Sequence, residues 1–437
     1  MPANWKIFAG GAMVITLFLI FSHGVSAQTL GWVKESTNAA PFAEFLHEMV
    51  YDAARQEVIL FGGVYNPSFN LFPLLDHTVA WNGTTWVSKT PSVSPPPRIE
   101  HGMAYDGARQ EVILFGGGTA PGLFINRTPL NDTWIWDGAT WQQKFPSNSP
   151  TPRSNFGMAY DAERNETILF GGQDPAPTLT CCLQDDTWAW NGTDWFQKSP
   201  TLSPSRRSHH QMVYDSARKQ IILFGGIDAS GQLLNDIWVW DGTNWELKSS
   251  TTSPSLRTNF AMTFDESLQK VVLYGGQGTA GSLDDTWVWD GNDWAQLSVS
   301  SKPPPQRLHD MVYDASRKEI VMYGGDGALR ETWTLPTGSQ KRPVILIPGI
   351  LGSWEKDGEL ALDPILHTYD NLWEALKLAG YEEDKDLFAF PYNWRSSNNL
   401  TSLSLKQKIE DVKNICQCLK VDIVGHSMGG LLARSYI

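Results

Sequence analysis

Six glycine pairs recur along this chain, and they constrain its fold more than any other feature. They are Gly62/Gly63, Gly116/Gly117, Gly171/Gly172, Gly225/Gly226, Gly275/Gly276 and Gly324/Gly325, separated by 54, 55, 54, 50 and 49 residues. Each pair ends a short apolar run that follows a Tyr-Asp or Phe-Asp pair. Such self-similarity is typical of repeat architectures, in which one copy cannot bury its apolar face alone. The sequence therefore predicts six copies of one structural unit.

Each copy is predicted to form four short strands. Runs such as EVILF at 111–115 are rich in β-branched and aromatic residues and are bounded by turn formers. The Asp106 side chain can accept bonds from backbone amides in the turn that follows the first strand. Trp134 and Trp136 alternate onto one face of the third strand, and an Asp-Gly turn leads to a fourth strand from Trp141. Packing such sheets around an axis buries these rings, which predicts an all-β six-bladed β-propeller.

The Gly-Gly pair and the downstream Trp-x-Trp box resemble the kelch repeat. The resemblance covers residues from about 30 to 336 and implies a kelch propeller domain over residues 28–336. The first copy has Val79 in place of Trp134, and the sixth continues after Trp333 as TLPTG, without the box. Trp32-Val33-Lys34 resembles the fourth strands of complete copies, such as the one from Trp86. We expect it to close the ring as the outermost strand of blade six.

Residues 1–27 are predicted to be a signal peptide. Lys6 precedes an apolar run at 7–21, and Val25-Ser26-Ala27 forms a small-residue cleavage site. The alternative is a membrane anchor, but the run is near the shortest length that spans a bilayer and no basic stop-transfer flank follows it. We expect a secreted, extracytoplasmic protein whose mature chain begins near Gln28.

Composition excludes several functions. A net charge of -13 argues against nucleic acid as a partner. Cysteine is scarce, and the spacings of Cys181, Cys182, Cys416 and Cys418 do not resemble a zinc site. No metal or cofactor is expected, and the Tyr, Cys and His constellation of galactose oxidase, a copper enzyme with a kelch propeller, is not recognised here.

A histidine and an arginine each occur once in most copies of the repeat, and we interpret both as parts of the repeat structure rather than as ligand-binding residues. They are the histidines His47, His101, His210 and His309 and the arginines Arg98, Arg153, Arg207 and Arg257. The variable loops that follow the glycine pairs, such as 64–75, 118–130 and 173–184, are where we expect a protein or carbohydrate ligand to bind.

A different fold is predicted after the linker at 337–342. Val344 to Ile347 forms an apolar run suited to a buried strand. Helices are expected at 372–378 and around Leu403, Leu405, Ile409, Val412 and Ile415, and strands at 387–390 and 421–424. Alternation of strand and helix implies a parallel sheet.

The sequence Gly-His-Ser-Met-Gly at 425–429 follows the last of these strands. It is predicted to be a nucleophile elbow, in which Ser427 occupies a strained strand-to-helix turn and the Met428 amide faces an oxyanion. His426 directly precedes Ser427 and cannot turn to act as its base.

Residues 343–437 resemble the α/β-hydrolase fold of lipases and, more narrowly, the lecithin:cholesterol acyltransferase-like family. The segment 344–353 is similar to that family's oxyanion strand and loop, and Pro-Tyr-Asn-Trp-Arg at 391–395 to its Pro-Tyr-Asp-Trp-Arg element, with Asn393 in place of the aspartate. The resemblance implies an ester or lipid substrate. Ser427 would attack the acyl carbonyl, the Met428 and Ile350 amides would hold the oxyanion, and water or an alcohol would accept the acyl group.

The order of the catalytic triad in this fold is Ser, then Asp or Glu, then His. Residues 431–437 contain neither an acid nor a histidine, and Asp363, His367 and Asp370 come before the nucleophile, so none is assigned to the triad. We expect a truncated α/β-hydrolase segment that ends after the elbow, with a bare edge on the nucleophile strand and no esterase turnover in the chain as given.

Two functions compete. The first is an exported serine acyl hydrolase (lipase or esterase) or lipid O-acyltransferase whose propeller is a binding module. The second is a non-catalytic extracellular kelch propeller that binds protein or carbohydrate and carries a vestigial hydrolase segment. The intact elbow and oxyanion loop favour the first.

Overall fold

The computed structural model describes residues 18–20, 30–36, 41, 45–65, 73–119, 128–174, 182–326, 330–338, 343–348, 353–356, 359–362, 370–378, 381–384, 386–393, 398–416, 421–426 and 432. The chain divides into two compact units. One is Thr29–Gly338, and the other combines Met1–Gln28 with Ser339–Ile437. The first unit contains the six repeats, and the second contains the strand that precedes the predicted nucleophile.

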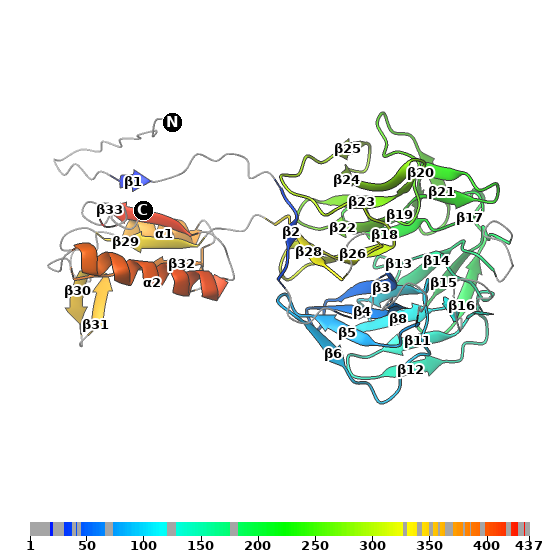
Figure 1. Cartoon of the computed structure of the whole chain (residues 1–437), viewed down its shortest axis with the longest axis horizontal. Coiled ribbons are helices and arrows are strands. Elements are labelled where there is room, and N and C mark those ends of the chain that lie inside the picture. The colour runs from blue at the N-terminus through cyan, green and yellow to red at the C-terminus, as the bar shows by residue number, and fades with distance from the viewer. Residues whose placement is uncertain are drawn as a thin grey trace. The chain divides into compact units, whose positions relative to one another are not determined.

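The first unit is a six-bladed β-propeller, as predicted (Figure 1). The strands of every blade are antiparallel and hydrogen-bond to one another in sequence order. The first strand of each blade is the innermost. The strands, from inner to outer, are β3 (Phe45–Asp52), β4 (Glu57–Val64), β5 (Thr78–Trp81) and β6 (Trp86–Lys89) in blade 1; β7 (Gly102–Asp106), β8 (Glu111–Phe115), β11 (Thr133–Trp136) and β12 (Trp141–Lys144) in blade 2; β13 (Gly157–Asp161), β14 (Glu166–Phe170), β15 (Thr187–Trp190) and β16 (Trp195–Lys198) in blade 3; β18 (Gln211–Asp215), β19 (Gln220–Asp228), β20 (Leu233–Trp240) and β21 (Trp245–Lys248) in blade 4; β22 (Ala261–Asp265), β23 (Lys270–Gly278), β24 (Gly281–Trp289) and β25 (Trp294–Gln296) in blade 5; and β26 (His309–Asp314), β27 (Glu319–Gly324), β28 (Thr332–Pro336) and β2 (Val33–Lys34) in blade 6. Short strands β9 (Gly118–Thr119), β10 (Thr128–Pro129) and β17 (Arg207–Ser208) lie in the connections.

The hydrophobic core lies between the blades. In one interface, Ile113 and Phe115 of blade 2 pack with Phe156, Leu169 and Trp195 of blade 3. Because each cluster draws residues from two blades, no blade completes its core alone.

The glycine pairs are required by these interfaces. Gly116 has a φ of 61°, and a Cβ there would lie 2.9 Å from the Arg153 carbonyl and 3.3 Å from the Phe156 ring of the next blade. At Gly62 the His101 ring takes the place of Phe156, with Cε1 2.8 Å from that Cβ position. The recurring histidines therefore pack as rings between blades, in agreement with the structural interpretation.

The recurring arginines are fully buried. Arg98 donates to both carboxylate oxygens of Asp132, at 2.8 and 2.7 Å, and to the Gly116 carbonyl at 2.8 Å. Equivalent ion pairs join Arg153 to Asp186, Arg207 to Asp236 and Arg257 to Asp285. Their planar, bidentate geometry holds the loop after each glycine pair.

The ring closes as predicted. Strand β2 pairs antiparallel with β28, with Val33 opposite Thr334 and Lys34 opposite Trp333 (Figure 1). Trp32 is 1% exposed and packs in a cluster that joins blades 5 and 6. The two ends of the repeat region thus complete one blade, which removes an unpaired edge.

A second row of contacts runs around the outer strands. The indole nitrogens of Trp86, Trp141, Trp195, Trp245 and Trp32 each donate to a buried threonine of the preceding blade, namely Thr332, Thr78, Thr133, Thr187 and Thr286. In blade 4 the threonine is replaced by Ile237, and the Trp294 indole nitrogen has no hydrogen-bond partner among the described residues. Five of the six blade interfaces therefore share this bond.

The blades are also joined by a ring of backbone hydrogen bonds around the axis, which we call the axial belt. It consists of Leu46, Glu100, Asn155, His209, Asn259 and Leu308, and the amide of each donates to the carbonyl of the one before, at 2.9 to 3.4 Å. The Leu46 amide donates to the Leu308 carbonyl, so the ring is closed. All six residues have φ between 54° and 62°. This left-handed conformation suits Asn and His but strains the two leucines and the glutamate.

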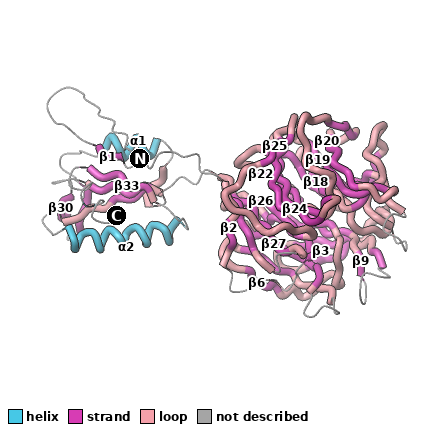
Figure 2. Tube along the Cα trace, turned by 45° about the horizontal axis from the view of Figure 1, so that its top comes forward, coloured by secondary structure: helices cyan, strands magenta, loops and turns pink. Residues whose placement is uncertain are grey.

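The second unit contains a four-stranded sheet in the order β1-β33-β29-β32. Strands β29 (Val344–Ile347), β32 (Leu387–Ala389) and β33 (Asp422–His426) are parallel, as predicted. Helix α1 (Asp370–Leu378) lies between β29 and β32 in sequence, and helix α2 (Asn398–Cys416) between β32 and β33. Figure 2 shows the two helices on opposite sides of the strands. A hairpin of β30 (Ser353–Lys356) and β31 (Glu359–Leu362) was not predicted from the sequence.

One expectation for this unit was wrong. The nucleophile strand does not have a bare edge, because β1 (Phe18–Ile20) pairs antiparallel with β33. An apolar segment can satisfy the unpaired amides and carbonyls of a strand edge whatever its place in the sequence. The helix expected around Leu403 to Ile415 is confirmed as α2. Its residues Leu405, Ile409 and Val412 are buried against the sheet, whereas Leu403 and Ile415 are 65% and 56% exposed. These two residues lie off the buried stripe of the helix.

Replacing Leu308 in the axial belt with Asn is expected to raise the free energy of unfolding by about 1 kcal/mol, because Asn tolerates the left-handed conformation that strains Leu. Guanidinium denaturation measures this. The reverse change, Asn259→Leu, should lower stability by a similar amount, and equal stability of both variants and the parent chain would contradict the assignment of strain.

Replacing Thr133 with Val is expected to lower the free energy of unfolding by about 1–3 kcal/mol, because it leaves the buried Trp195 indole nitrogen without an acceptor. Thr133→Ser keeps the hydroxyl and should lose less. A Val variant as stable as the Ser variant would show that the bond does not stabilise the interface.

Candidate functional site

The carboxyl ends of three parallel strands meet at one edge of the sheet in the second unit. Strand β29 lies between its neighbours, with Ile347 opposite Gly425 of β33 and Leu346 opposite Ala389 of β32. Adjacent strands are separated by about 4.8 Å. The chain therefore leaves β29 at Pro348 and leaves β33 at His426 at neighbouring points of this edge, which we call the carboxyl edge.

The segment that follows β32 is anchored beside this edge. The Phe390 amide donates to the Leu346 carbonyl at 2.9 Å. The rings of Phe390 and Tyr392 stack, with their centroids 6.3 Å apart, and both belong to the cluster that contains Leu405 and Ile409 of α2. The first part of the Pro-Tyr-Asn-Trp-Arg element therefore packs its aromatic residues inward. Asn393 is exposed.

The predicted catalytic residues themselves lie outside the described residues. This applies to the nucleophile Ser427, to Met428 and to Ile350, whose amides are predicted to form the oxyanion hole. What the structure establishes is the strand before each of them. Ser427 follows β33 directly, and Ile350 comes three residues after the end of β29. Their roles stay predictions.

The carboxylates and the histidine upstream of Ser427 are not placed at this edge by the described part of the chain. Asp363 and His367 lie outside the described residues, and Asp370 is an exposed residue at the start of α1. The sequence had assigned none of the three to the triad, and the structure gives no reason to change that.

Titratable groups gather at the opposite, amino edge of the same sheet. Burial raises the pKa of Tyr381, and the carboxylates of Asp422 and Asp386 raise it further. The Val344 amide donates to the Asp386 carbonyl and the Asp422 amide to the Pro343 carbonyl, each at 2.8 Å. Because Asp422 begins β33 and His426 ends it, the full strand separates this cluster from Ser427.

The recurring histidines of the propeller are unsuited to acid–base chemistry at neutral pH. Burial lowers the pKa of His47, His210 and His309 to about 3 and that of His101 well below its usual range. Within the described parts of the chain, no group of three or more His, Cys, Asp or Glu side chains is placed to hold a metal ion. The predicted ligand loops at 64–75, 118–130 and 173–184 fall largely outside the described residues.

Among the residues that the structure describes, neither helix, α1 nor α2, is both long enough and apolar enough to cross a bilayer.

Two families match separate parts of the chain. Residues 165–341 match the KLHDC2/KLHL20/DRC7 Kelch-repeats domain. Residues 358–437 match the lecithin:cholesterol acyltransferase family. Both resemblances inferred from the sequence are thus confirmed, and the second match includes the elbow at 425–429.

Curated proteins similar to this chain fall into the same two groups. Host cell factor 1 of Homo sapiens is 26% identical over 196 residues, which are 40% of this chain and 9% of that protein. Lecithin-cholesterol acyltransferase-like 4 of Arabidopsis thaliana is 40% identical over 60 residues, or 13% of this chain and 11% of that protein. Phospholipase A(1) LCAT3 of the same plant is 36% identical over 78 residues, or 17% of each. The chain spans less than a fifth of the length of these relatives.

Proposed function

We propose that this chain is part of an exported serine acyl hydrolase or lipid O-acyltransferase that uses a kelch propeller as a binding module. The observation that carries the proposal is the parallel pairing of β29 with β33, in which Ile347 lies opposite Gly425. This register supports a shared site for the loop that begins at Pro348 and the elbow that contains Ser427. The matches to the lecithin:cholesterol acyltransferase family and to a phospholipase support ester or lipid acyl chemistry.

In the proposed mechanism, the Ser427 hydroxyl attacks the acyl carbonyl of the substrate. The amides of Met428 and Ile350 donate to the oxyanion that forms, and the alcohol leaves to give an acyl-serine. Water then releases a free acid, or a lipid alcohol takes the acyl group. Serine requires a general base for this attack, and no residue is assigned to that role.

Ser427 is expected to react with a fluorophosphonate probe. The protein should be expressed from the longest reading frame that contains this chain, and labelling and hydrolysis of p-nitrophenyl butyrate should both be measured. Ser427→Ala is expected to abolish labelling and to reduce hydrolysis to background, because it removes the nucleophile.

The matched control is Ser404→Ala, which alters an exposed serine of α2 and should leave both signals unchanged. Labelling that survives Ser427→Ala would contradict the assignment. Absence of labelling in every form would favour the alternative, a non-catalytic propeller that binds protein or carbohydrate.

Export is part of the proposal and rests on the composition of residues 1–27. Cleavage after Ala27 would also remove β1 and leave the free edge of β33 open to another strand.

Expression in cells with a secretory pathway is expected to yield a protein that begins at Gln28, which intact-mass analysis of the medium detects. A large basic residue at the cleavage site, as in Ala27→Arg, should prevent processing. A protein that keeps Met1 and stays with the membrane fraction would instead support the membrane anchor.

A further inference from the structure

A cavity of about 340 Å³ that is open to solvent lies along the axis of the propeller. Each inner strand contributes a methionine and an aromatic residue at the same register. They are Met49, Met103, Met158, Met212, Met262 and Met311, with Tyr51, Tyr105, Tyr160, Tyr214, Phe264 and Tyr313. Polar residues also line the cavity, namely Glu48, Gln211, Ser216, Thr263, Glu266 and Asp310. A volume of this size and a mainly apolar lining with a few polar groups are typical of sites for small organic ligands.

Three polar residues interrupt this lining at one level. The position before each methionine is Gly102, Gly157 or Ala261 in blades 2, 3 and 5, but Glu48, Gln211 or Asp310 in blades 1, 4 and 6. These three residues also line a second cavity of about 80 Å³ that reaches the axial belt. They therefore lie where the two cavities adjoin.

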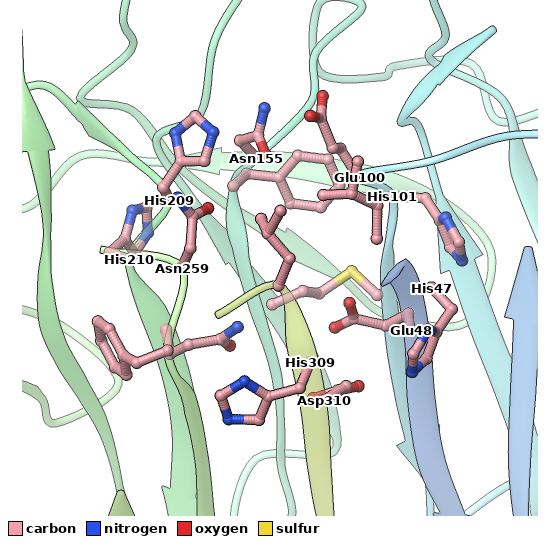
Figure 3. A pocket seen from close by; sticks show the side chains of 16 residues that line it. His47, Glu48, Glu100, His101, Asn155, His209, His210, Asn259, His309 and Asp310 are labelled. Carbon is pink, nitrogen blue, oxygen red and sulfur yellow. The ribbon is translucent and has the colours of Figure 1, made fainter. Parts of the chain in front are cut away.

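Glu48 and Asp310 belong to adjacent blades and lie next to each other. Figure 3 shows the Glu48 carboxylate pointing toward the middle of the cavity, with Asp310 beside it on the neighbouring strand. Asp310 accepts hydrogen bonds from the Met49 amide at 2.6 Å and from the Met311 amide at 2.7 Å. No comparable bond joins the Glu48 carboxylate to another described residue of the propeller. One of the two carboxylates is thus held in place, and the other is available to a ligand.

The surroundings do not supply a counter-charge. Neither cavity is lined by Lys or Arg. The titratable groups that line the smaller cavity are His47 and His309 on the same strands, His101 and His210 on neighbouring blades, and Glu100 and His209 of the axial belt. Burial lowers the pKa of each of the four inner histidines, so these rings are neutral near pH 7. The larger cavity is also lined by one more carboxylate, Glu266 of blade 5.

Burial raises the pKa of Asp310 to about 7. Burial raises the pKa of Glu48 as well, and the Asp310 carboxylate raises it further. When no cation is bound, repulsion between the two carboxylates favours the state in which the pair keeps a proton. A cation of suitable shape would replace that proton.

We propose that the larger cavity, which we call the axial cavity, binds a primary alkylammonium ligand. The ammonium group would lie between Glu48 and Asp310, and the alkyl chain would lie along the methionines and aromatic rings. An ammonium group has three donors and a full positive charge for two carboxylates. Aromatic rings nearby also attract a cation. The alkyl chain gains by leaving water for the apolar part of the cavity.

Isothermal titration of the full chain with hexylammonium chloride tests this proposal. Binding is expected at pH 8 and should be weaker at pH 6, because burial and mutual repulsion raise the pKa values of the two carboxylates and the ligand has to displace their proton at the lower pH. The ligand itself stays charged over this range, since alkylamines resemble Lys in pKa. Glu48→Gln should weaken binding at pH 8 by at least about tenfold.

Glu48→Gln is expected to fold, because Gln211 occupies the same register in blade 4, and its thermal unfolding is recorded alongside. The matched control is Glu100→Gln, which removes a carboxylate that lines only the smaller cavity and should bind as the parent chain does. Equal binding of 1-hexanol would show an apolar cavity without cation recognition and would overturn the proposal. Unchanged binding by a folded Glu48→Gln protein, or no binding of hexylammonium at millimolar concentration, would overturn it as well.

Discussion

The closed ring of backbone hydrogen bonds in the axial belt sets the geometry on which the rest of the propeller depends. Each amide reaches the preceding blade only because its own residue adopts a left-handed conformation, with φ near 60° in all six. This fixes where every inner strand starts relative to the next. The buried arginine comes two residues before the belt residue and the inter-blade ring one residue after it, as Arg98 and His101 do around Glu100.

Departures from the repeat concentrate in blade 6, where it meets blades 5 and 1. Leu46 and Leu308 replace the Asn found in blades 3 and 5, Gln306 replaces the buried arginine, and β2 completes blade 6 from the other end of the chain. The carboxylates of Glu48 and Asp310 lie at the junction of blades 6 and 1. The blade that closes the ring therefore departs from the repeat at both of its neighbours, and its junction with blade 1 carries the charges of the axial cavity.

Compensation between blades is visible in the turn after the first strand. Arg55, Arg109, Arg218 and Arg317 each donate to a carbonyl in the Asp-Gly or Asn-Gly turn of the next blade. Blade 6 lacks this turn, and the residue of blade 5 that would face it is Leu268, which packs beside the cluster of Trp32. A charged donor without an acceptor would be costly in a partly buried position, whereas leucine adds apolar contact.

The sequence by itself determined those features of the fold that depend on a repeated unit or on a local alternation of apolar and polar residues. Six copies predicted six blades, the surplus Trp32 segment predicted the closing strand, and the apolar run at Val344–Ile347 predicted a buried parallel strand. It also marked Ser427 as the candidate nucleophile, because the glycines of the predicted elbow, Gly425 and Gly429, lie close to this serine in the sequence. Local patterns report the backbone conformation and the face that each side chain takes. Only the tertiary structure decided the pairing of Glu48 with Asp310, the left-handed backbone of Leu46 and the attachment of β1 to β33, because each depends on residues that approach one another only after distant segments have packed.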